Sequence, residues 1–111
     1  MKAALMDSNG GADVLYYGDA PDPTADPGEV VIDIHAATVN GADWKVREGG
    51  GMYGITSFPY ILGRDFSGVV SEVGEGVDDL AVGDAVFAAT AAALWRHHGF
   101  APAWPLGTAV L

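Results

Sequence analysis

The side chains best suited to binding or catalysis gather between Val39 and Val70. This stretch carries three of the five Lys and Arg residues of a chain whose formal net charge is −10. Polar groups on loops that a rigid scaffold holds together are the usual place of binding and chemistry. The stretch is therefore the predicted functional region, and its polar residues of interest are Asn40, Asp43, Lys45, Arg47, Arg64 and Asp65.

A purely structural account of the same residues stays open. On a short helix Asp43 and Arg47 stand one turn apart and can pair, which is worth about 0.3–0.5 kcal/mol. Asn40 is an acceptable residue to cap the N-terminus of that helix. Arg64 and Asp65 can likewise form a local ion pair before the next strand.

Other motifs do not indicate a catalytic or metal site. Residues 49–54 match G-x-G-x-x-G, but that fingerprint binds a dinucleotide only between a strand and a helix, and here it comes after a helix-like turn. We therefore predict a flexible loop. His97 and His98 are adjacent and diverge by about 100° on a helix, which does not suit a pair of metal ligands. Ser67 lacks the preceding glycine of a nucleophile elbow. His35 is expected on the solvent face of a strand. No metal ligands are predicted.

The composition excludes several classes of protein. A length of 111 residues allows one domain with one modest core. A strongly acidic chain is a poor ligand for nucleic acid and for anionic membranes, which both require a basic face. No apolar run approaches the roughly 20 residues that span a bilayer, and the N-terminus lacks the apolar stretch of a secretory signal. Because Cys is absent, disulfides and thiolate metal sites are excluded. We expect a cytoplasmic protein.

Short strands with glycine-rich connections predict a mainly β fold, a small and mostly antiparallel barrel or sandwich. The clearest strand covers residues 29–39. Within it Val30, Ile32, Ile34 and Ala36 share one face and are expected to face the core, because side chains alternate along a strand.

The remaining elements are shorter. A helix of at most two turns is expected over residues 40–48, ended by three consecutive glycines. Gly68 inside a strand indicates a bulge or a close approach of another backbone. The other expected strands cover residues 2–6, 14–17, 66–73 and 82–87.

The amino-acid composition of the chain changes after Asp84. All 15 Asp and Glu residues lie at or before that position. Residues 88–98 are predicted to be helical, and Gly99, Pro102 and Pro105 prevent the helix from continuing. Composition leaves open whether this end is a genuine C-terminal helix, a truncated end or a frame-shifted end. We predict a domain over residues 1–88 and an atypical tail over residues 89–111.

Four segments resemble a known family in order and spacing: ATVNGADWKVREG (37–49), FPYILGRDFSGVV (58–70), VG (73–74) and VGDAVF (82–87). Together they resemble the N-terminal half of the medium-chain dehydrogenase/reductase superfamily. The most similar branch is that of the zinc-independent, zeta-crystallin-like quinone oxidoreductases. The resemblance implies a GroES-like, partly open β-barrel with short helices, lacking the Rossmann domain that binds NADPH in the family.

The resemblance also implies that no zinc is bound. Zinc-dependent members of the superfamily carry a catalytic Cys where this chain has Gly41, and Gly-His-Glu where it has Gly63-Arg64-Asp65. A thiolate and an imidazole are the zinc ligands there. This chain offers neither at these positions.

In the resembling branch a hydride passes from NADPH to the β-carbon of a quinone or enone, and negative charge develops on the substrate oxygen. The resemblance implies that this chain is the catalytic-domain half of such an NADPH-dependent oxidoreductase, with a small quinone or α,β-unsaturated carbonyl compound as substrate. Asn40 matches a family position near the nicotinamide. The predicted catalytic residues are Asn40, Asp43 and Lys45, and the predicted substrate or cofactor contacts are Tyr53, Arg64 and Asp65. Asn40 and Asp43 match distinctive positions of the family, and the others are chosen for their charge and placement.

The family's cofactor domain is missing from this sequence, so the isolated chain is expected to be inactive and to bind NADPH poorly. The face that would dock on that domain is then expected to expose apolar surface and to promote self-association. A non-enzymatic GroES-like interaction module and a non-functional truncated product are the alternatives.

Overall fold

The computed structural model describes residues 1–50, 57–89 and 108–110, and it confirms the predicted mainly β fold with short helices. A three-stranded sheet has the order β2-β1-β4 and a four-stranded sheet the order β6-β5-β3-β7. Neighbouring strands are antiparallel throughout both sheets. The elements are β1 (Lys2–Met6), η1 (Ala12–Val14), β2 (Leu15–Asp19), β3 (Val30–Thr38), α1 (Gly41–Arg47), β4 (Tyr60–Ile61), β5 (Asp65–Val73), β6 (Ala85–Ala89) and β7 (Thr108–Val110).

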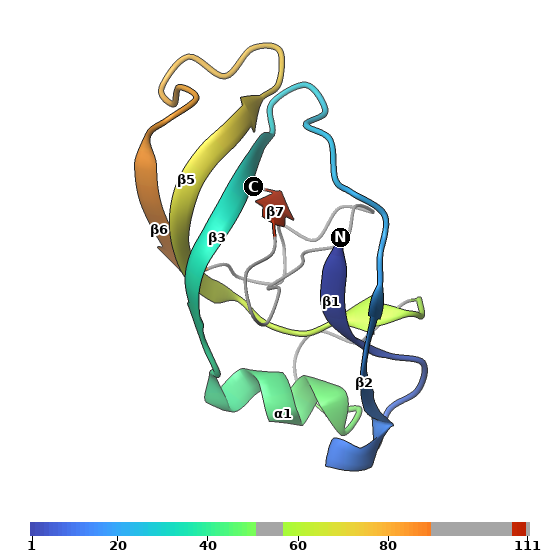
Figure 1. The fold of residues 1–111 in the computed structure, drawn as a ribbon. Coiled ribbons are helices and arrows are strands. Elements are labelled where there is room, and N and C mark those ends of the chain that lie inside the picture. Colours follow the sequence, from blue (N-terminus) through green and yellow to red (C-terminus); the bar gives the residue numbers. More distant parts are fainter. Residues whose placement is uncertain (51–56, 90–107, 111) are drawn as a thin grey trace.

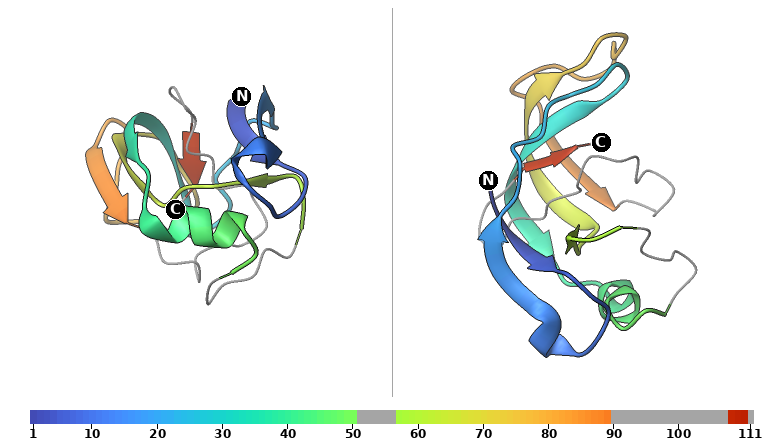
Figure 2. Two further views of the ribbon diagram at one scale, coloured as in Figure 1. Left: turned by 90° about the horizontal axis from the view of Figure 1, so that it is seen from below. Right: turned by 90° about the vertical axis from the view of Figure 1, so that its right-hand side faces the viewer.

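Helix α1 bridges the two sheets at one end of the molecule. Figures 1 and 2 show it across the end where β3 finishes and where β1 leads into η1. Its C-terminal carbonyls are bound from the β1–η1 loop: the backbone N–H of Gly10 donates to the carbonyl of Arg47 at 3.0 Å. Asn9 Nδ2 also donates to the carbonyl of Val46 at 3.1 Å. These bonds hold the C-terminal end of the helix against the loop that follows β1.

The largest core cluster lies on one face of the four-stranded sheet. Val30, Ile32 and Ile34 of β3 are buried as predicted, together with Phe66 and Val70 of β5. Apolar residues at alternate positions of two neighbouring strands thus form a single packed layer.

The prediction that Ala36 faces this core is wrong. Ala36 is exposed, and Ala37 packs against the cluster instead. The pairing of β3 with β5 shifts register between Ile34 and Ala36. A bulge of this kind inserts one residue and moves every later side chain to the opposite face. As a result Ala36 and Thr38 share the outer face of the sheet, beside the start of β5.

Several boundaries differ from the sequence prediction. The two-residue strand β4 was not predicted, because it is too short to show alternation. Strand β6 starts at Ala85 rather than at Val82, since Gly83 adopts a φ of 96° within a turn. Strand β6 also continues through Ala89, so the predicted helix start at residue 88 is wrong.

The rest of the predicted helix, residues 90–98, lies outside the described residues. Residues 108–110 form β7, which pairs with Val31–Asp33 of β3. The end of the predicted tail therefore belongs to the four-stranded sheet. The division of the chain between residues 88 and 89 stays a prediction.

Several large apolar side chains are exposed among the described residues. Val39 is 83% exposed and Phe87 of β6 is 88% exposed. No helix in the described ranges has the length and apolar character needed to span a membrane.

We expect Phe87→Ser to reduce the predicted self-association, because among the described residues it removes the most exposed aromatic side chain without disturbing the core. Light scattering over a concentration series would measure the apparent mass. Tyr17→Ser is the matched control, since Tyr17 is 62% exposed on the other sheet. An apparent mass that falls equally in both variants would contradict a role for the β6 face.

Candidate functional site

Asn40 caps the N-terminus of α1, as predicted. Its Oδ1 accepts a hydrogen bond from the backbone N–H of Ala42 at 2.9 Å. In return the backbone N–H of Asn40 donates to Oδ2 of Asp43 at 2.8 Å. This reciprocal pattern is a capping box, which satisfies helix N–H groups that lack partners within the helix. It also turns the Asp43 carboxylate back toward β5.

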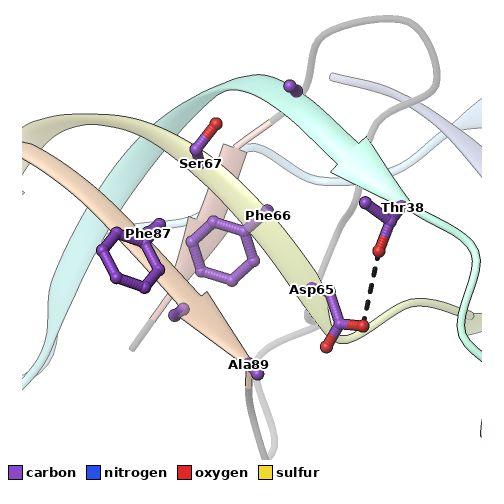
Figure 3. A pocket seen from close by; sticks show the side chains of 8 residues that line it. Thr38, Asp65, Phe66, Ser67, Phe87 and Ala89 are labelled. Carbon is purple, nitrogen blue, oxygen red and sulfur yellow. Dashed lines mark hydrogen bonds between the residues drawn. The ribbon is translucent and has the colours of Figure 1, made fainter.

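The same two side chains bind Arg64, the last residue before β5, and Asp65, the first residue of β5. Asn40 Nδ2 donates to Oδ2 of Asp65 at 2.8 Å, and Asp43 Oδ1 lies 3.6 Å from Nε of Arg64. Thr38 Oγ1 also donates to Oδ2 of Asp65, at 3.4 Å, as Figure 3 shows. We call Asn40, Asp43, Arg64 and Asp65 the polar cluster.

Asp43 pairs with Arg64, and not with Arg47, the partner that the helical spacing also allows. The capping box points Asp43 toward Arg64. Arg47 instead donates through Nε to the carbonyl of Gly10 at 3.1 Å and pairs with Glu48 at 3.2 Å. Arg47 therefore anchors the helix to the β1–η1 loop and lies apart from the polar cluster.

Four of the six predicted site residues, Asn40, Asp43, Arg64 and Asp65, are thus brought together. Lys45 is exposed on α1, and its Nζ lies 5.6 Å from the ring centroid of Trp44. Tyr53 lies outside the described residues. His35 is exposed, as predicted, and His97 and His98 also lie outside the described residues.

Burial governs the electrostatics of the polar cluster. Desolvation raises the pKa of Asp43 above its usual value of 3.8. The hydrogen bond from Asn40 and the positive charge of Arg64 oppose this rise, and the negative charge of Asp65 adds to it. The side chain of Asp43 is only 10% exposed, so the carboxylate depends on these partners to stay charged.

Tyr60 is a member of this environment that the sequence prediction missed. Burial raises the pKa of its phenol to about 12, and Arg64 and Asp43 both act on it electrostatically. The phenol therefore stays protonated at neutral pH and keeps its O–H donor. Its place shortly before the Gly63-Arg64-Asp65 segment was the only signal in the sequence.

A cavity of about 350 Å³ lies beside the polar cluster on the outer face of β3, β5 and β6. Asp65 contributes to both, and Figure 3 shows its carboxylate at one end of the cavity and the ring of Phe87 at the other. Asp65 Oδ1 is buried without a hydrogen-bond partner. The lining residues are Ala36, Thr38, Asp65, Phe66, Ser67, Phe87, Ala88 and Ala89.

The described residues hold no group of three or more His, Cys, Asp or Glu side chains that could bind a metal ion. A Cβ added to Gly41 would meet no atom within 4 Å. The position next to the helix cap is therefore open but offers no ligand, and Arg64 adds a positive charge to the same cluster.

We expect the pKa of Asp43 to make its contribution to stability depend on pH. Because the pKa of Asp43 is higher in the folded chain than the usual 3.8, the folded state binds protons more tightly than the unfolded state. The stability that this proton binding adds at acidic pH is lost as the pH rises above 3.8. The Asp43→Asn variant has no ionisable group at this position. The unfolding free energy of Asp43→Asn relative to wild type should therefore rise from acidic to neutral pH.

Urea titrations at several pH values would measure this difference, with Asp78→Asn as a control for the loss of one exposed carboxylate. A difference that falls as the pH rises would show that the partners of Asp43 outweigh its burial.

Two antiparallel β-sheets bridged by a short capped helix, with polar side chains where the helix meets a strand, define a GroES-like domain of the dehydrogenase/reductase class. The family model described as the alcohol dehydrogenase GroES-like domain matches residues 26–105. The chain therefore belongs to this family, within the medium-chain dehydrogenase/reductase superfamily. This confirms the predicted GroES-like fold.

Individual proteins of the superfamily are also similar to this chain. The chain is 43% identical over 74 residues to the trans-enoyl reductase fsr4 of Gibberella fujikuroi, covering 67% of this chain and 21% of that protein. It is 38% identical over 98 residues to the mitochondrial NAD(P)H oxidoreductase RTN4IP1 of Mus musculus, covering 74% of this chain and 21% of that protein. The quinone oxidoreductase structure from Coxiella burnetii superimposes with a TM-score of 0.80 at 30% identity, over 99% of this chain and 34% of that one.

The chain therefore spans about a fifth of the length of these curated relatives. Its relatives include quinone and NAD(P)H oxidoreductases. The similarity supports an oxidoreductase domain for the region that carries the polar cluster.

Proposed function

We propose that this chain provides the substrate-side half of the active site of a zinc-independent, NADPH-dependent oxidoreductase that reduces quinones or enones. The observation that carries the proposal is the polar cluster. A hydrogen bond from Asn40 to Asp65 and an ion pair between Asp43 and Arg64 join the start of α1 to the start of β5, next to an apolar cavity. An apolar pocket with a few convergent polar groups is typical of a small-molecule site.

In this proposal the chain's residues bind and polarise the substrate oxygen. The Asn40 amide offers an N–H donor, and Arg64 supplies positive charge where negative charge develops on that oxygen. Tyr60 adds a protonated phenol to the same environment. NADPH would supply the hydride. The cavity beside the cluster is lined mainly by apolar side chains, which suit the ring of a quinone or the carbon skeleton of an enone.

The described residues fit only the reacting end of the cofactor. The polar cluster can meet a carboxamide or carbonyl group. The connection from β3 to α1, however, is only Val39-Asn40, which is too short to form the glycine-rich turn that holds a pyrophosphate. The chain alone should therefore bind NADPH weakly. Titration followed by NADPH fluorescence measures this, and micromolar binding would contradict a half-site.

Zinc independence is supported by the donor set of this site. Gly41 has no side chain, Arg64 is cationic, and the chain contains no Cys. The two carboxylates of the cluster are already engaged, Asp43 with Arg64 and Asp65 with Asn40. Zinc prefers thiolate and imidazole ligands, and the cluster offers neither.

A domain graft would test the proposed function. Residues 1–110 would replace the matching N-terminal region of the Coxiella burnetii quinone oxidoreductase, whose fold superimposes on this chain. We expect the graft to oxidise NADPH in the presence of 2,3-dimethoxy-5-methyl-1,4-benzoquinone. A folded graft that binds NADPH but reduces neither this quinone nor a simple enone would overturn the proposal.

A further inference from the structure

The Asn40 amide has a single orientation that satisfies its neighbours. Its Oδ1 accepts from the backbone N–H of Ala42 at 2.9 Å, and its Nδ2 donates to Oδ2 of Asp65 at 2.8 Å. Turning the amide by half a revolution would place two donors together at Ala42 and two acceptors together at Asp65. The helix cap and the carboxylate therefore select the same orientation.

The bond to Asp65 is the stronger of the two restraints. A hydrogen bond to a carboxylate is charge-assisted and roughly twice as strong as one between neutral groups. Asp65 is itself held by Thr38 Oγ1, which donates to the same oxygen at 3.4 Å. Thr38 is the last residue of β3 and Asp65 is the first residue of β5, and the register of the sheet fixes the two opposite each other.

An amide nitrogen carries two N–H groups, and Asp65 occupies one of them. Among the described residues, Asp65 is the acceptor that Nδ2 of Asn40 contacts, which leaves its second N–H for a ligand. We propose that Asp65 is a positioning residue. It holds the Asn40 amide so that this second N–H is available to a hydrogen-bond acceptor of the ligand, namely a carbonyl oxygen. This inference rests on the proposed function and names the group that the site would recognise.

The sequence makes this bond simple to observe. The chain contains two Asn residues, Asn9 and Asn40, and no Gln. An ¹H–¹⁵N correlation spectrum of the full chain therefore contains only two pairs of carboxamide signals. Asn9 Nδ2 donates to the carbonyls of Val46 and Arg47, both at 3.1 Å, so its signals serve as an internal reference.

Asp65→Ala should move the Asn40 pair toward the shifts of a free carboxamide and leave the Asn9 pair unchanged. Asp65→Asn keeps the shape and should have a smaller effect in the same direction, which covers the case in which the alanine variant does not fold. Its new carboxamide pair is identified by its absence from the wild-type spectrum. Thr38→Val is the matched control, because it removes only the other donor to Asp65. Unchanged Asn40 signals in both Asp65 variants would overturn the inference.

A ligand titration tests the role of the second N–H. We would add 2,3-dimethoxy-5-methyl-1,4-benzoquinone, which reacts chiefly with thiols, and the chain has none. In wild type we expect one of the two Asn40 signals to shift, and in Asp65→Ala we expect this shift to be lost. An equal shift in both proteins would overturn the positioning role. If the Asp65 variants rearrange the amide but no quinone or enone probe shifts it in wild type, Asp65 still positions Asn40 and the proposed substrate class fails.

Discussion

Gly68→Ala is expected to destabilise the folded chain strongly, because it places a methyl group against the main chain of the neighbouring strand. Gly68 of β5 lies opposite Ile34 of β3, and a Cβ added to it would lie 2.1 Å from the carbonyl oxygen of Asp33. No rotamer change can move this obstacle, so the two central strands would have to separate. Overpacking that side chains can absorb costs about 1–3 kcal/mol. We therefore expect a loss above about 3 kcal/mol.

Thermal unfolding followed by circular dichroism would measure the loss, since about 1 kcal/mol shifts the midpoint by about 4–8 °C in a domain of this size. Gly41→Ala is the matched control, because a Cβ there meets no atom within 4 Å. We expect it to be neutral or slightly stabilising, as alanine favours a helix over glycine. Equal midpoints for the two variants would show that β3 and β5 pack less closely than the structure places them.

The strands that the sequence predicted well are those with a regular pattern. Residues 2–6 form β1 with the predicted bounds, and the alternation in β3 predicted Val30, Ile32 and Ile34 at the core. The pattern could not reveal the bulge before Ala36, because a bulge depends on pairing with β5 and leaves no mark in β3 itself. The close approach at Gly68 was predicted, since a glycine inside a strand usually marks a bulge or a neighbouring backbone that leaves no room for a side chain.

The contacts within the site were predictable from spacing only where they are local. Asn40 and Asp43 are three residues apart and form the capping box that such a spacing favours. The role of Lys45 stays a prediction. Lys45 is exposed and stands about 200° around the helix from Asp43, and charge alone does not say which side of a helix a residue occupies. The partners Arg64 and Asp65 come from beyond α1 and β4, and sheet register, not spacing, brings them to Asn40.

Asn40→Ala is expected to have the largest effect on catalysis, measured in the graft onto the Coxiella burnetii enzyme. The substitution removes the N–H that we propose for the substrate oxygen, and loss of one such donor costs about 10²–10³ in kcat in other enzymes. It also removes the helix cap, which costs about 0.5–2 kcal/mol of stability. A fall in activity alone could therefore reflect either loss.

Asn40→Ser separates the two effects, because serine caps a helix well but carries no amide. Both variants should lose about 10²–10³ in kcat, while only the alanine variant should lose the stability of the cap. Steady-state rates with NADPH and the quinone, measured beside urea unfolding of the same proteins, would test this. If Asn40→Ser kept the kcat of the unsubstituted graft, the amide would serve only as a cap, and the donor to the substrate oxygen would have to come from Arg64 or Tyr60, which share the same electrostatic environment.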